Sequence, residues 1–109
     1  MLDFTKINFS DAAINAIRVS ESSVEIDYLD WQERKHTLIF VNVISCCMFS
    51  PYGRALSHGE LEAGTDYIRD CCNVADENSL EHFFAFNFVD AWADSKILRI
   101  VAEAVTERL

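Results

Sequence analysis

Residues 23–31 read SVEIDYLDW, and their side chains alternate between apolar and acidic. Val24, Ile26 and Tyr28 fall on one face of an extended chain, while Glu25 and Asp27 fall on the other. This period of two indicates a β-strand with one face in the core and both carboxylates in water. Carboxylates in water keep ordinary pKa values, so we expect a solvated face and not an acid–base pair.

Two longer apolar stretches also favour strands. Residues 37–49, TLIFVNVISCCMF, carry β-branched and aromatic side chains on both faces, which is typical of a central strand covered on both sides. The turn sequence SPYG at residues 50–53 ends this strand. Residues 80–90, LEHFFAFNFVD, predict another strand, with one face formed by Phe84, Phe86 and Phe88.

Both ends of the chain fit two periodicities. Residues 11–19 form either an Ala-rich helix capped by Ser10 or a strand that ends in a Ser-Glu-Ser turn. Residues 96–108 form either a helix with a polar stripe or a strand. The core face of that strand would consist of Leu98, Ile100, Ala102 and Ala104. Periodicity leaves both choices open.

Residues 54–79 form an acidic insert. From Glu60 to Glu81 the chain has seven acids and one base, Arg69, which is a net charge of −6 out of a total of −9. Ser57 and Glu60 have the spacing of a capping box, which predicts a short helix over residues 58–71. Gly64 weakens this helix by about 1 kcal/mol. The acidic run is either a solvated loop or a negative surface for a basic partner.

Charge and composition exclude several classes of function. The chain of 109 residues has 18 acids and 9 bases, and an acidic protein repels nucleic-acid phosphates and anionic membranes. The opening sequence, MLDFTKINFSD, is unlike a signal peptide, and the longest apolar stretch is too short to cross a bilayer. Half of the residues are hydrophobic, which is enough for a core without disulfides. We expect one compact cytoplasmic domain over residues 1–109.

The four cysteines form two adjacent pairs, Cys46-Cys47 and Cys71-Cys72. Neighbours on a strand point to opposite faces, and zinc sites favour C-x2–4-C spacing, so neither pair predicts a metal site. We expect free thiols that fill the core, and no cofactor. A nucleophilic site would place a thiol beside a histidine, and the chain has His36, His58 and His82. No local motif or glycine-rich phosphate loop supports such a site, so no catalytic residue is assigned.

Aromatic side chains occupy three expected turns, at Trp31, Tyr52 and Trp92. They either pack over the ends of the core or anchor a partner protein, because exposed Trp and Tyr often anchor interfaces. Together with the insert they give the candidate partner-binding residues, which are Trp31, Tyr52, Arg54, Glu60, Glu62, Asp66, Asp70 and Trp92.

Five segments in order resemble a loose group of small bacterial proteins: FSDAAINAIRV, VEIDYLDW, TLIFVNV, HFFAFNFVD and LRIVAEAV. The group includes immunity proteins against contact-dependent and polymorphic toxins and many domains of unknown function. The resemblance covers most of the chain and consists mainly of hydrophobic patterning, and the closing turn DAWADSK lacks the Gly that eases a tight hairpin. It implies strands at both ends, a mostly antiparallel β domain with a small helical insert, and a binding function, because an immunity protein typically blocks a toxin by covering it.

These observations predict a mainly β protein, an antiparallel curved sheet or sandwich with one short helix in an insert. The alternative is an α+β fold with a helix at residues 11–19 or 96–108. The expected function is non-enzymatic binding of another, basic protein in the bacterial cytoplasm, and its narrower form is toxin neutralisation. Two alternatives are a self-assembling structural dimer, in which a second copy covers the two-sided strand at residues 38–49, and a small enzyme with a Cys/His site.

Overall fold

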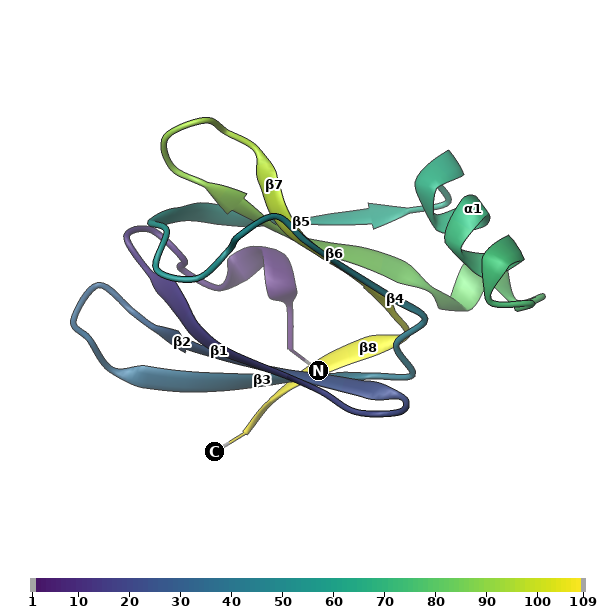
Figure 1. The fold of residues 1–109 in the computed structure, drawn as a ribbon, viewed down its shortest axis with the longest axis horizontal. Coiled ribbons are helices and arrows are strands. Elements are labelled where there is room, and N and C mark those ends of the chain that lie inside the picture. Colours follow the sequence, from purple (N-terminus) through teal and green to yellow (C-terminus); the bar gives the residue numbers. More distant parts are fainter. Residues whose placement is uncertain (1, 109) are drawn as a thin grey trace.

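The structure is a computed structural model that describes residues 2–108, in which two four-stranded antiparallel sheets pack face to face (Figure 1). Sheet A has the strand order β1-β2-β3-β8, with β1 (Ala13–Val19), β2 (Ser23–Leu29), β3 (Lys35–Val41) and β8 (Ala104–Arg108). Sheet B has the order β4-β7-β6-β5, with β4 (Ser45–Met48), β7 (Lys96–Ala102), β6 (Phe84–Asp90) and β5 (Leu56–Ala63). One short helix, α1 (Asp66–Val74), completes the sandwich, and the mainly β prediction is confirmed.

The N-terminal segment lies between the two sheets (Figure 1, purple). Its 3-10 turn η1 (Phe4–Lys6) begins at Asp3, whose carboxylate accepts hydrogen bonds from the Thr5 backbone and hydroxyl. The Phe4 ring is 2% exposed and makes edge contacts with Phe86 and Phe88, at 5.3 Å between ring centroids in both cases. The N-terminal segment therefore adds the Phe4 ring to a core that the side chains of the two sheets form otherwise.

Close contact with this segment requires a glycine in β5. A Cβ atom added at Gly59 would lie 2.7 Å from a ring carbon of Phe4 and 3.0 Å from one of Phe9. Both distances are below ordinary contact, so the ring of Phe4 lies directly against the β5 backbone.

The single central strand predicted over residues 37–49 is wrong, because the stretch contains two strands in different sheets. β3 ends at Val41, Asn42 has a left-handed backbone (φ 53°), and the chain crosses to sheet B before β4 begins at Ser45. Both strands have an apolar face against a core, so hydrophobicity continues across the crossing and hides it. Within β4, Cys46 packs on the core between the sheets while Cys47 pairs with Arg99 on the outer face, which confirms their opposite directions.

The helix predicted over residues 58–71 begins too early, because residues 56–63 form the edge strand β5 of sheet B. Thr65, not Ser57, caps the helix: its hydroxyl accepts a hydrogen bond from the Ile68 backbone at 3.4 Å. Gly64 precedes the helix with φ 66°, so it does not weaken it from within. Thus residues 54–79 include a strand of the sandwich, and the capping-box spacing of Ser57 and Glu60 was coincidental.

α1 covers part of the outer face of sheet B (Figure 1). Ile68 and Cys72 are buried there against Phe83, Ala85 and Val101. This second apolar cluster explains why β6 and β7 carry apolar side chains on both faces.

β1 occupies residues 13–19, and β7 and β8 occupy the segment 96–108, so the helical alternatives for residues 11–19 and 96–108 are wrong. The second segment divides at Glu103 into β7 of sheet B and β8 of sheet A. Leu98, Ile100 and Ala102 face the core as expected, but past the division Val105 takes the place assigned to Ala104. Strict alternation fails there because the chain changes sheets.

The expected solvation of Asp27 is also wrong. Asp27 is only 3% exposed. Its carboxylate accepts two hydrogen bonds from the Arg18 guanidinium, at 2.7 and 2.9 Å, and one from the Thr37 hydroxyl at 2.7 Å. The hydrogen bonds from Arg18, and to a smaller extent the one from Thr37, hold the pKa of Asp27 well below its usual range. The long side chain of Arg18 on β1, with Lys35 of β3 at 3.4 Å, thus covers a carboxylate that alternation alone places in water.

Candidate functional site

Trp31, Tyr52 and Trp92 lie at one end of the sandwich, on three separate connections. Trp31 is in the β2–β3 turn, Tyr52 in the β4–β5 connection and Trp92 in the β6–β7 turn. The strand registers bring these turns to the same end: Leu56 pairs with Asp90 in sheet B, and Tyr52 forms a bridge with Ile14 of sheet A. Figure 1 shows these connections on the left, away from α1. We call the surface formed by Trp31, Tyr52 and Trp92 the aromatic end.

The side chains of the aromatic end extend into solvent. Trp92 is 87% exposed, Trp31 62% and Tyr52 54%, so the interpretation that they pack over the core is wrong. Phe49, in the same connection as Tyr52, is 59% exposed and was not predicted as a site residue. Its place directly before the SPYG turn was the available signal.

Two aspartates accept hydrogen bonds from the backbone of turns at the aromatic end. In the β2–β3 turn one carboxylate oxygen of Asp30 accepts hydrogen bonds from the Gln32 and Arg34 backbones, both at 2.9 Å. In the β6–β7 turn Asp90 accepts one from the Ala93 backbone at 2.7 Å, and its other oxygen pairs with Arg54. Arg54 therefore links the β4–β5 connection to the β6–β7 turn through its ion pair with the buried Asp90, and its own side chain stays 39% exposed.

The acidic candidates lie elsewhere. Asp66 and Asp70 are exposed on α1, which follows the far end of β5, where Ala63 pairs with Phe84. We call the surface of these two aspartates the acidic end. The molecule extends 41 Å along its longest axis, and the two ends lie on opposite sides of the sandwich (Figure 1).

Glu62 and Glu60 are engaged by neighbours. Glu62 accepts hydrogen bonds from Asn87 at 2.6 Å and Arg99 at 2.8 Å, and Lys96 lies at 3.3 Å. Burial opposes ionisation of Glu62, but these partners hold its pKa below the usual value. Glu60 lies 3.0 Å from the His58 ring. Glu62 thus belongs to a polar network on the outer face of sheet B.

A pocket of about 270 Å³ opens beside Trp31 around His36, and the side chains of Asp30 and Glu107 also line it. The two ring nitrogens of His36 lie 2.9 Å from Asp30 and 3.2 Å from Glu107, and the ring stacks on Tyr28. The hydrogen bond to Asp30, followed by that to Glu107, raises the pKa of His36. Sequence reasoning missed this cluster because Glu107 is 71 residues away, whereas the Tyr28–His36 pairing follows from the hairpin register.

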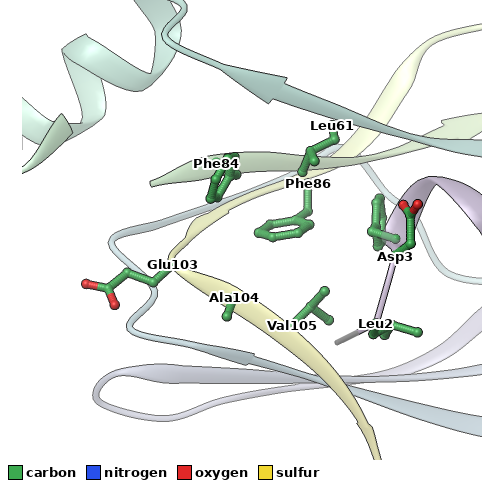
Figure 2. Close-up of a pocket in the computed structure, with 9 residues that line it drawn as sticks. Leu2, Asp3, Leu61, Phe84, Phe86, Glu103, Ala104 and Val105 are labelled. Carbon is green, nitrogen blue, oxygen red and sulfur yellow. The ribbon is translucent and has the colours of Figure 1, made fainter. Parts of the chain in front are cut away.

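A larger and mostly apolar pocket, of about 450 Å³, lies between the sheets at the open edge formed by β8 and β5 (Figure 2). We call it the intersheet pocket. Phe86 and Val105 form its floor, and Leu61 of the edge strand lies at its mouth, 42% exposed. The full lining comprises Leu2, Asp3, Phe4, Leu61, Phe84, Phe86, Glu103, Ala104 and Val105. No sequence pattern indicated this space, because it depends on how the two sheets diverge.

Among residues 2–108, the hydrogen bonds and ion pairs of His36, His58 and His82 go to Asp, Glu or Ser side chains and not to thiols. All four cysteines are free, and burial raises the pKa of Cys46 and of Cys72, which disfavours the nucleophilic thiolate. His58 bonds to Ser57 and Glu60 on β5, and not in a helix as expected. Within residues 2–108, no group of three or more His, Cys, Asp or Glu side chains is placed to hold a metal ion.

Comparisons of the chain with protein-family models, with curated proteins and with solved structures find no match. Among the described residues, no helix has the length and apolar character needed to cross a membrane.

Proposed function

We propose that this protein binds another protein through its aromatic end. The observation that carries the proposal is that turns from both sheets hold large aromatic side chains in solvent at one end of a rigid sandwich. Trp and Tyr are the residue types that most often dominate binding energy, and each has few rotatable bonds to order on binding. Rigid turns lower the entropic cost of association further.

The acidic end has a separate role in this proposal. Charge steers a partner only over about one Debye length, roughly 8 Å at physiological ionic strength. The molecule is 41 Å long, so Asp66 and Asp70 would attract a basic partner to α1 and not to the aromatic end. Binding therefore depends on the aromatic side chains, and charge reversal on α1 is expected to leave it unchanged. This revises the expectation that both surfaces act on one partner.

Toxin neutralisation is the narrower form of the proposal, and it rests on the resemblance to immunity proteins. Occluding a toxin needs a surface that adapts to one partner, and exposed turns on a fixed scaffold supply such a surface. A toxin gene next to the gene for this chain would support this form, and a metabolic operon there would contradict it.

The self-assembly alternative keeps part of its original argument. Leu38 and Phe40 are fully buried in the core, and Cys46 packs against it, so these side chains are not left for a second copy. Val41, Met48 and Phe49 of the same stretch are exposed and could meet one. Light scattering over a dilution series separates a monomer that binds other proteins from a dimer that forms through the aromatic end.

Affinity capture from lysate of the source cells, quantified by mass spectrometry, tests the proposal. Trp31→Ala and Trp92→Ala should each weaken capture of the same specific partner, by about 30-fold if the residue is a hot spot. Val74→Ala is the matched control, because Val74 is 90% exposed but lies on α1. Asp66→Lys with Asp70→Lys is the charge control. Capture that survives loss of both tryptophans and disappears on charge reversal would refute the proposal.

A further inference from the structure

We propose that the intersheet pocket is a binding site for a small amphiphile with a hydrocarbon tail and a cationic head group. This site is separate from the aromatic end, and it does not rest on the proposed function. At about 450 Å³ the pocket has the size of small-molecule sites, which are mostly apolar with few polar groups.

The apolar part of the pocket belongs to the core. Phe4, Phe86 and Val105 are at most 5% exposed, although all three line the pocket. A hydrocarbon tail there would contact side chains from both sheets and from the N-terminal segment (Figure 2). Apolar area is removed from water on both sides of such a contact, which favours binding.

The pocket is open because β5 and β8 are edge strands. Each stands at the end of its sheet in the strand order, so the two do not pair with each other along this side of the sandwich. Leu61 on β5 lies at the entrance of the pocket. Its side chain lines the pocket and is partly exposed, so a ligand can reach the apolar interior from solvent at this point.

The charge around the pocket selects the head group. The only charged residues of the lining are the carboxylates Asp3 and Glu103, which lie at opposite ends of the apolar surface (Figure 2). Lys6 of η1 acts electrostatically on Asp3 but is not part of the lining. An anionic head group would meet a carboxylate at either end and a chain of net charge −9, whereas an alkylammonium group would pair with the carboxylate at whichever end it reaches.

The carboxylates remain available for such a pair. Asp3 uses one oxygen, Oδ1, for its hydrogen bonds to Thr5, and Glu103 accepts from the Asn42 amide through Oε2 alone. Hydrogen bonds from Thr5 lower the pKa of Asp3, so it is ionised at neutral pH.

The test is a head-group series with one tail: octylammonium, octanol and octanoate, each titrated into the whole protein below its micelle concentration. Calorimetry and methyl NMR are the measurements. We expect saturable binding of one octylammonium per chain, with shifts at the methyl groups of Leu61, Ala104 and Val105. Octanoate should bind at least about tenfold more weakly than octylammonium, because the carboxylates of the lining attract an ammonium group and repel a carboxylate. Octanol should fall between them.

Two kinds of variant complete the test. Leu61→Trp fills the entrance and should abolish binding, whereas Val74→Trp places the same side chain on α1 and should not. Asp3→Asn with Glu103→Gln keeps hydrogen-bond acceptors and should weaken octylammonium to the level of octanol. Loss of binding in Leu61→Trp supports the proposal only if this variant keeps the urea midpoint of the wild type. If its midpoint changes, the NMR shifts of the wild-type protein locate the site instead. Absence of saturable binding, equal affinity for octylammonium and either other probe, or shifts outside the pocket would each overturn the proposal.

Discussion

Replacement of Gly59 by alanine tests the central packing of this fold. The added Cβ would lie 2.7 Å from Phe4 and 3.0 Å from Phe9, so something must move. The Phe4 ring packs against the rings of Phe86 and Phe88 at 5.3 Å between centroids, so it can retreat only toward the intersheet pocket, at the cost of these contacts. The substitution therefore overpacks the core.

The expected loss of stability follows from two opposing contributions. Overpacking a dense core costs about 1–3 kcal/mol, and replacing glycine by alanine within a strand returns about 0.5–1 kcal/mol of backbone entropy. At the middle of both ranges the net loss of unfolding free energy is about 1 kcal/mol. For a domain of this size that lowers the melting temperature by about 4–8 °C.

Urea unfolding of a double-mutant cycle measures the effect. Phe4→Leu alone destabilises the protein by leaving a cavity, but it makes room for the new methyl group. In the Phe4→Leu background, Gly59→Ala should therefore cost less than in the wild type, by at least about 0.5 kcal/mol. Gly53→Ala is the control: Gly53 has φ 72° and nothing within 4 Å of an added Cβ, so its cost is backbone strain that Phe4→Leu cannot relieve.

Two results would refute the packing. Gly59→Ala might equal the wild type in its urea midpoint, or its cost might add independently to that of Phe4→Leu. Either result would mean that the N-terminal segment does not lie against β5.

Three further predictions concern titratable groups. Asp27→Asn should reduce stability at neutral pH by about 1–3 kcal/mol, because buried hydrogen bonds to Arg18 are weakened. Since folding lowers the pKa of Asp27, its contribution is full above about pH 4 and is lost as pH falls below that value, so urea midpoints of the variant should change less with acid than those of the wild type. Folding raises the pKa of His36, so its contribution is full below about pH 6.5 and is lost as pH rises through the folded pKa; NMR titration should place that pKa lower in Glu107→Gln, and no change would contradict the pairing. Cys46 and Cys72 should react with iodoacetamide far more slowly in the native protein than in urea by mass spectrometry, and fast native alkylation would contradict their burial and raised pKa.

The strands at residues 23–29 and 84–90 were predictable from sequence. Residues 23–29 and 84–90 alternate clearly, and the structure has strands over those residues. Alternation could not reveal where the chain changes sheets, because Phe40 and Cys46 both face the core although they belong to different sheets. The same limit applies at Glu103, between β7 and β8. β5 was missed because this edge strand, with Ser57, His58 and Glu60, has no β-branched residue.

The candidate site was predictable only in part. Trp31 and Trp92 were correctly placed in turns, since polar residues with turn preference surround both. Their gathering at one end depends on sheet order, and so does their distance from Asp66 and Asp70. The intersheet pocket and the His36 cluster join residues far apart in sequence, and no local pattern encodes such long-range pairs.

The position of Phe4 between the sheets has a consequence for synthesis on the ribosome. Phe4 emerges early, but its contacts with Phe86 and Phe88 cannot form until most of the chain has been made. β8, the last described strand, completes sheet A beside β3. It also supplies Val105 to the floor of the intersheet pocket. Nascent chains that stop before Ala104 should therefore remain sensitive to protease, and protection should appear only after β8 has left the exit tunnel.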